Sequence, residues 1–125
     1  MLQYETQVSI YERLSSGIET SVFDCVPTET IFPYVVLGEI ISVPDDTKTN
    51  SGERITQKIY IFSNAKGKEE TFFIAKDIKQ ALSAELIVEG AFVIDQSIKK
   101  CTVLETDGDF FQGVIELEVL LEEME

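Results

Sequence analysis

The chain has 125 residues, of which 44% are hydrophobic, so it is long and apolar enough to fold around one core. It carries 23 Asp and Glu against 10 Lys and Arg, a net charge of −13, which argues against a protein that wraps or reads DNA. It contains no His, which excludes a zinc site of the usual Cys/His kind and removes the commonest general base of enzymes.

The N-terminus, Met1–Glu5, has no basic region followed by an apolar stretch, so we expect no signal peptide. No apolar run approaches the roughly 18 residues of a membrane span, so we expect no membrane association. The negative charge has two interpretations. It either keeps a cytosolic protein soluble, or it marks a face that repels DNA or meets a basic partner.

The first predicted element is a helix with one apolar stripe, because apolar residues recur at steps of three and four. The stripe consists of Tyr4, Val8, Tyr11, Leu14 and Ile18. Gly17 is predicted to end the helix in a left-handed conformation. A short strand, Ser21–Val26, follows.

The next stretch predicts a β-hairpin with a long connection. Tyr34–Ser42 is apolar on both faces, which is typical of a central strand covered on both sides. The connection, Val43–Gly52, is polar and rich in turn formers. The strand after it alternates, with Ile55, Ile59 and Ile61 on one face and Arg54, Thr56 and Lys58 on the other.

A second helix is predicted over Lys68–Ser83, with Ser63 or Asn64 as its cap. Its buried stripe is predicted to contain Ile74, Ala75, Ile78, Ala81 and Leu82. The adjacent Phe72 and Phe73 leave two alternatives. Either the helix buries both rings against the sheet, or one ring packs against a neighbouring subunit.

The C-terminal third predicts three strands, Leu86–Val88, one within Phe92–Glu105, and Phe110–Leu121, with a turn at Asp107-Gly108. In the last strand Phe111, Ile115, Leu117, Val119 and Leu121 belong to the core, while Phe110, Glu116 and Glu118 point the other way. An exposed Phe beside an acidic strand face indicates an interface. We therefore predict one α+β domain over 1–125, in the order α-β-β-β-α-β-β-β, with a mainly antiparallel sheet and both helices on one face.

No residue cluster predicts a catalytic, cofactor or metal site. Asp45-Asp46 lacks a further carboxylate at ligand spacing, and Asp107-Gly108-Asp109 lacks the Glu of a calcium loop. Cys25 and Cys101 lie far apart and are interpreted as reduced, largely structural thiols. Glu122-Glu123 is interpreted as a solvated end, with a partner contact as the alternative.

Three segments resemble the tail completion (head-to-tail joining) proteins of long-tailed bacteriophages and prophages. They are Val22–Pro27, Phe32–Glu39 and the link Phe62–Gly67 before the second helix. In element order the resemblance covers Tyr4–Leu121, although Gly17–Ser21 is too short for a second short helix that the family often carries. The resemblance implies a fold similar to tail-terminator proteins and a ring, typically hexameric, that caps the tail tube and docks on the head connector. It implies no catalytic residues and no cofactor.

We therefore predict a structural virion protein and not an enzyme. The expected partners are other copies of the chain, the tail tube protein and the head connector protein, with no specific nucleic-acid binding although DNA passes through the ring. The free protein is expected to be a ring or a monomer. It would lie in the host cytoplasm during assembly and at the head–tail interface in the virion.

The sheet edges, the long hairpin and the acidic face of the last strand are the predicted contact surfaces. The candidate interaction residues are Asp45, Asp46, Lys48, Arg54, Phe110, Glu116 and Glu118. The alternative function is an acidic module of the DNA-mimic type that occupies a basic nucleic-acid-binding protein. Against this alternative, the carboxylates do not run along one continuous face in the predicted fold.

Overall fold

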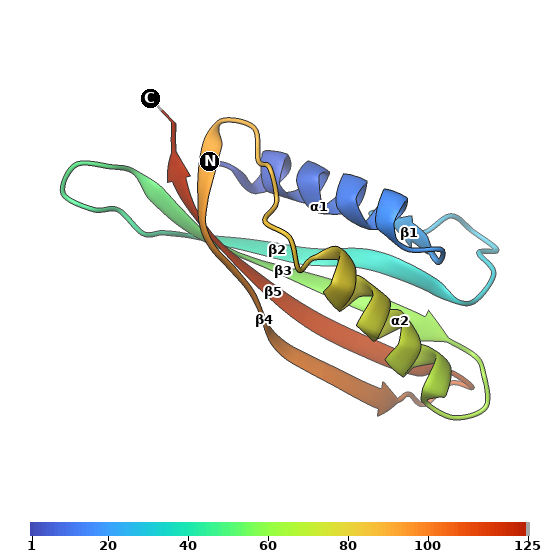
Figure 1. The fold of residues 1–125 in the computed structure, drawn as a ribbon. Coiled ribbons are helices and arrows are strands. Elements are labelled where there is room, and N and C mark those ends of the chain that lie inside the picture. Colours follow the sequence, from blue (N-terminus) through green and yellow to red (C-terminus); the bar gives the residue numbers. More distant parts are fainter. Residues whose placement is uncertain (125) are drawn as a thin grey trace.

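The computed structural model describes residues 1–124 and consists of a five-stranded sheet with two helices on one face (Figure 1). The elements are α1 (Gln3–Gly17), β1 (Ser21–Phe23), β2 (Tyr34–Pro44), β3 (Gly52–Ser63), α2 (Glu69–Ala81), β4 (Ala91–Glu105) and β5 (Phe111–Glu123). The predicted α+β class is confirmed. The predicted strand Leu86–Val88 is wrong, because this segment is a loop that buries Leu86 and Val88 and exposes Ile87.

The strands follow the order β1-β2-β3-β5-β4, in which only the β1–β2 pair is parallel. The two predicted hairpins, β2–β3 and β4–β5, are present and join through β3 and β5. β2 lies between β1 and β3 and contacts α1, as predicted, but the prediction that it is covered on both faces along its length is wrong. β1 pairs with Tyr34–Val36 only, and Ile41 and Val43 are about half exposed.

Both outer long strands contain register shifts, one in β2 between Leu37 and Ile40 and two in β4. At the β2 shift the buried side chain of Gln57 donates from Nε2 to the carbonyl of Gly38 at 3.0 Å. A bulge leaves backbone groups without ladder partners, and here the Gln57 amide supplies a replacement.

The core lies between the sheet and the helices. The inward side chains of β3 and β5 alternate with outward ones, as predicted, and pack against α1 and α2. The largest fully buried apolar side chains are Ile10, Leu14, Val35, Ile55, Ile59, Ile61, Ile78, Ile115, Leu117, Val119 and Leu121.

α1 is rotated relative to its predicted orientation. Tyr4 is 77% exposed and Tyr11 is 40% exposed, whereas Thr6 and Ser9 face the core beside Ile10. The two hydroxyls are satisfied, because Thr6 Oγ1 donates to the Leu2 carbonyl at 2.6 Å and Ser9 Oγ to that of Ile87 at 2.9 Å. Burial of a hydroxyl costs little when it makes such bonds.

The two helices meet near their C-terminal ends. A Cβ added at Gly17 would lie 3.2 Å from Cβ of Ala81, so the small residue permits close approach of α2. Gly17 does not adopt a positive φ, and the predicted left-handed ending is therefore wrong. The guanidinium of Arg13 donates to the carbonyls of Ala81, Ala84 and Glu85 at 3.0, 2.8 and 3.0 Å.

α2 begins without the predicted side-chain cap. Its N-cap residue is Lys68, which makes no capping bond, and Ser63 is buried and donates to the Glu70 carboxylate at 2.5 Å. Of the predicted buried stripe, Ile74, Ile78 and Leu82 are buried, and Ala75 and Ala81 are partly buried against the core. No helix within residues 1–124 is long and apolar enough to cross a membrane.

Candidate assembly surfaces

The sheet face opposite the helices has no covering element within residues 1–124 (Figure 1). We call it the open face. Strand register assigns to it Tyr34, Val36, Ile41 and Val43 of β2, Arg54, Thr56, Lys58, Tyr60 and Phe62 of β3, and Gln112, Val114, Glu116, Glu118 and Leu120 of β5.

One end of the open face carries a cluster of aromatic rings. The ring centroids of Tyr34 lie 5.3 Å from Phe32 and 5.2 Å from Phe62, and Phe110 lies 5.8 Å from both Phe32 and Phe62. These distances fall in the range of favourable aromatic pairs. We call these four residues the aromatic cluster.

Phe110 therefore occupies a different environment from the predicted one. It lies opposite the core side, as expected, but it is half-buried among Phe32 and Phe62 and is not an isolated exposed ring. Phe111, predicted as a core residue, is also only half-buried. The sequence pattern missed this cluster because Phe32 belongs to the loop before β2 and its position does not follow from strand alternation.

Beside the aromatic cluster, Tyr60 and Glu39 form a hydrogen bond that sequence reasoning did not predict. Tyr60 Oη donates to Glu39 Oε1, and Nζ of Lys58 lies 3.9 Å from Glu39 Oε2. The bond favours the neutral phenol and the charged carboxylate. It therefore raises the pKa of Tyr60 to about 12 and lowers the pKa of Glu39. The Tyr60 ring lies over Gly38, where any Cβ would overlap it.

The middle of the open face is an alternating set of charges. Arg54 lies 3.3 Å from Asp45 and 3.9 Å from Glu118, and Lys99 also lies 3.9 Å from Glu118. Glu116 is opposite Lys58 of β3 and Lys100 of β4 in the strand register. Exposed pairs of this kind contribute up to about 1 kcal/mol each to stability. Their more important effect is to cancel the negative potential of β5 locally.

The tip of the β2–β3 hairpin holds the other predicted residues. Asp46 Oδ1 accepts from the backbone N–H of Gly52 at 2.9 Å, and the N–H of Asp45 donates to the Gly52 carbonyl at 2.9 Å. Lys48 is exposed at the end of the loop. The structure thus brings Asp45, Arg54 and Glu118 together and keeps Lys48 and Phe110 apart from them.

Two further sequence interpretations change. Cys25 and Cys101 are free and exposed, so the interpretation of both as structural thiols is wrong. Phe72 and Phe73 are 54% and 58% exposed, so α2 does not bury both rings. Within residues 1–124, no three His, Cys, Asp or Glu side chains gather in a way that could hold a metal ion.

Comparison with known proteins gives consistent matches. A family model described as "Tail completion protein gp17" matches residues 10–122. The tail completion protein gp17 of Bacillus phage SPP1 is 28% identical over 87 residues, which are 69% of this chain and 65% of that protein. The match therefore spans slightly less than two-thirds of that relative's length.

Solved structures show the same fold. A chain from the virion of the native gene transfer agent (GTA) particle superposes with a TM-score of 0.82 at 20% identity, covering 93% of both chains. The structure of bacteriophage SPP1 gp17 gives a TM-score of 0.59 at 23% identity, covering 98% of this chain and 91% of that one. At these identities the similarity establishes the fold alone.

Proposed function

The chain belongs to the gp17 family of phage tail completion proteins, and we propose that it is a ring subunit that caps the tail tube and joins it to the head connector. As a tail completion protein it is a structural component of the virion. The proposed partners are further copies of the chain, forming a hexamer in the particle, the tail tube protein and the head connector protein. Assembly would take place in the host cytoplasm.

The observation that carries this proposal is the β2–β3 hairpin. It extends past the helix layer at one end of the molecule (Figure 1). On its open face Ile41 and Val43 are 49% and 52% exposed, beside the loop Asp45–Ser51. A strand end that is apolar yet uncovered is typical of a surface that another protein covers. A projecting hairpin can reach a neighbouring subunit or the tail without disturbing the core.

The charge distribution supports an inert passage for DNA through the proposed ring. Arg54, Lys58 and Lys99 each lie within 4 Å of a carboxylate, so the open face has no basic stripe. DNA binding depends on neutralising many phosphates with unpaired cations. The same alternation of charges argues against a DNA mimic, which needs a continuous acidic face.

The test removes the hairpin tip. Asp45–Ser51 would be replaced by a short Asn-Gly turn, and the protein mixed with tails that lack their completion protein. We expect the trimmed chain to fold normally, because the loop contributes no buried apolar side chain, but to leave tail ends uncapped in electron micrographs and to yield no infectious particles.

The control is Lys48→Ala with Thr49→Ala, which keeps the loop length. This variant should cap tails nearly as well as the wild type if the length and shape of the loop matter more than the Lys48 and Thr49 side chains. The proposal is wrong if the trimmed protein, checked for folding by circular dichroism, still joins tails to heads at the wild-type yield.

A further inference from the structure

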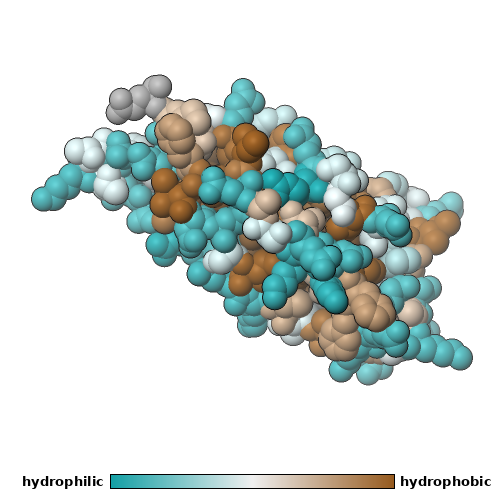
Figure 2. All heavy atoms as spheres, in the orientation of Figure 1, coloured by the Kyte–Doolittle hydropathy of each residue, from teal (hydrophilic) through white to brown (hydrophobic). Residues whose placement is uncertain are grey.

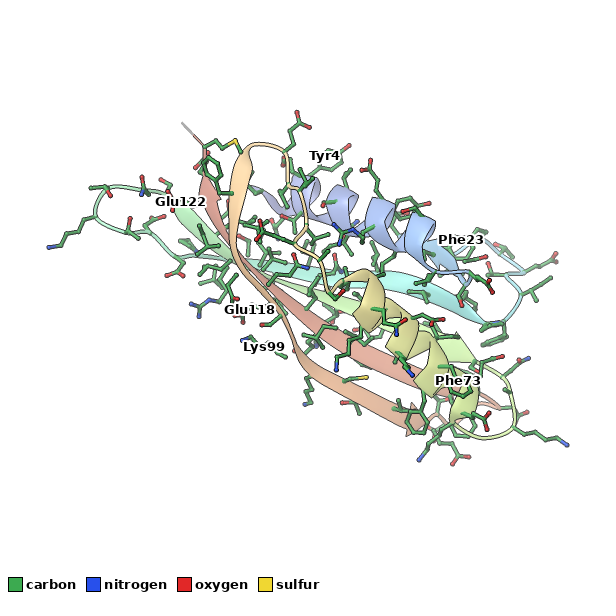
Figure 3. The ribbon with its side chains drawn as sticks, viewed as in Figure 1. Tyr4, Phe23, Phe73, Lys99, Glu118 and Glu122 are labelled. Atoms are coloured by element: carbon green, nitrogen blue, oxygen red, sulfur yellow. The ribbon has the colours of Figure 1, made fainter. Side chains whose placement is uncertain are left out.

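One flank of α1 presents aromatic side chains to solvent next to carboxylates. Tyr4, Val8 and Tyr11 follow one another at helical spacing, and Tyr4 lies on the outer surface of the helix layer (Figure 3). They line a hollow of about 410 Å³ together with Gln7, Glu12 and Asp24. We call Tyr4, Val8, Tyr11, Glu12 and Asp24 the acidic flank.

The acidic flank has no charge partner within residues 1–124. Neither Glu12 nor Asp24 takes part in an ion pair, and no Lys or Arg lines the hollow. The nearest Arg in sequence, Arg13, directs its guanidinium to backbone carbonyls on the other side of the helix. An apolar stripe with unpaired carboxylates matches a surface that offers an aromatic ring and cations.

α2 offers such a surface on its outer flank. Phe72, Ala75, Lys76 and Lys79 recur at helical spacing, and Phe72 is 54% exposed. Ala75, Lys76 and Lys79 line a hollow of about 290 Å³ with Ile98 and Cys101 of β4, without a carboxylate. Neither lysine makes an ion pair within residues 1–124. We call Phe72, Lys76 and Lys79 the basic flank.

The two flanks lie on opposite sides of the molecule. α1 contacts β1, β2 and β3, while α2 contacts β3, β5 and β4, and β1 and β4 are the two edges of the sheet. In the orientation of Figure 1, Figure 2 shows the apolar residues of the surface as separate patches among hydrophilic ones. Two unlike, complementary surfaces on opposite sides of one chain fit a head-to-tail contact, which closes into a ring when the rotation per copy divides the circle.

We propose that the acidic flank of one copy binds the basic flank of the next, with Phe72 inserted against Tyr4, Val8 and Tyr11, and Lys76 and Lys79 opposite Glu12 and Asp24. This inference rests on the proposed ring and assigns its subunit contact to the helix layer. It also explains how a chain with a net charge of −13 associates with itself, because the hollow at the basic flank is lined by two lysines and no carboxylate. We assign the binding partner as a second copy of this chain, because the chain carries both the acidic flank and the complementary basic flank.

The test is a charge-reversal cycle on tails that lack their completion protein. Lys76→Glu with Lys79→Glu reverses one flank, and Glu12→Lys with Asp24→Lys reverses the other. Because like charges placed together cost several kcal/mol, each reversal alone should lower the fraction of tail ends with a ring by about tenfold or more. The protein with both flanks reversed should recover capping to within about twofold of the wild type, since the pairs are restored with opposite sign.

Two matched controls isolate the contact. Lys66→Glu with Lys68→Glu makes the same charge change in the loop before α2 and should leave capping unchanged. Phe72→Ser should reduce capping, while Phe73→Ser, a neighbour of similar exposure on the other flank, should not. All variants are first compared with the wild type by thermal melting.

The outcomes separate the two proposals. If wild-type protein forms no ring on tail ends, the proposed function fails and this inference fails with it. If the wild type forms rings and the single reversals do so equally well, only this inference is overturned. If single reversals abolish rings and the double reversal does not restore them, the flanks do not bind each other, and the inference is again overturned.

Discussion

Arg13 joins three parts of the molecule through a single guanidinium. Its bonds to the carbonyls of Ala81, Ala84 and Glu85 hold the end of α2 and the following loop against α1. The side chain is half-buried, and its acceptors are backbone atoms more than sixty residues away in the chain. No sequence pattern marks such a contact, because any residue type supplies a carbonyl.

Arg13→Ala should therefore lower the free energy of unfolding by about 1.5–3 kcal/mol, the range for hydrogen bonds that involve a charged group. Arg13→Lys should recover little, because an ammonium cannot reach three carbonyls in a fork. Urea denaturation measures the change. Arg54→Ala is the control, whose exposed ion pairs should contribute about 1 kcal/mol or less. Equal losses for the two alanine variants would contradict this assignment.

The Tyr60–Glu39 hydrogen bond predicts a distinct titration. Of the four tyrosines, Tyr60 should ionise with a pKa of about 12, against the ordinary 10.0. Because the folded pKa is raised, the associated stability is fully present below pH 10 and is lost as the pH rises through 12. Phenolate absorbance measures the titration, and Tyr60→Phe should remove the late phase. Persistence of that phase in Tyr60→Phe would show that another tyrosine is responsible.

At the scale of the elements, periodicity was the reliable signal. Alternation predicts β3 and β5, and apolar residues at steps of three and four predict α2, because each of these elements has a core face and a wetter face. The two hairpins follow from the turn formers between their strands. The buried face of α1 was predicted wrongly for two reasons. Tyr4 and Tyr11 were counted as apolar although they are exposed, and Thr6 and Ser9 are buried because their hydroxyls donate hydrogen bonds to backbone carbonyls. Strand alternation predicts that Arg54 and Glu118 lie on the same face of the sheet, away from the core, and the structure places them there. The hydrogen bond between Glu39 and Tyr60 does not follow from alternation, because Glu39 lies at the register shift in β2.

The aromatic cluster should stabilise the end of the open face. Phe110→Ser removes contacts with Phe32 and Phe62, and aromatic pairs contribute about 0.5–1.5 kcal/mol each beyond their burial, so a loss of about 1–3 kcal/mol is expected. Phe92→Ser, at a site 55% exposed on β4, should change the free energy of unfolding by about 0.5 kcal/mol or less. Thermal melting compares the two. If both variants lose only about 0.5 kcal/mol or less, Phe110 does not pack in the aromatic cluster in solution.

At the scale of the whole molecule, positive and negative side chains are distributed unevenly over the surface. Negative charge dominates overall, but on the open face cations alternate with carboxylates. This arrangement could not be predicted from composition, because it depends on the strand order β3-β5-β4 that places Lys58 and Lys100 on either side of Glu116. The sequence resemblance identified the family, whereas the position of each charge required the fold.

We expect no binding of duplex DNA by the free protein at near-physiological salt. On the open face Arg54, Lys58 and Lys99 lie beside carboxylates, and the two lysines of the basic flank are too few to release many counterions. Fluorescence anisotropy with a labelled duplex measures the affinity. Reversing Glu116→Lys together with Glu118→Lys should create measurable binding on the open face. Micromolar affinity in the wild type would refute the inert passage.

The register shifts in β2 and β4 have a consequence for the protein before assembly. A sheet with straight, unpaired edges is a template for the edge of another copy, and many copies made together then stack into open-ended fibrils. The shifts between Leu37 and Ile40 and at two places in β4 interrupt the regular spacing of donors and acceptors along both long edges. A strand from another copy can therefore form regular backbone hydrogen bonds with the free edge of β2 or β4 over only a few residues. The interruptions should therefore disfavour edge-to-edge aggregation of free copies at high protein concentration.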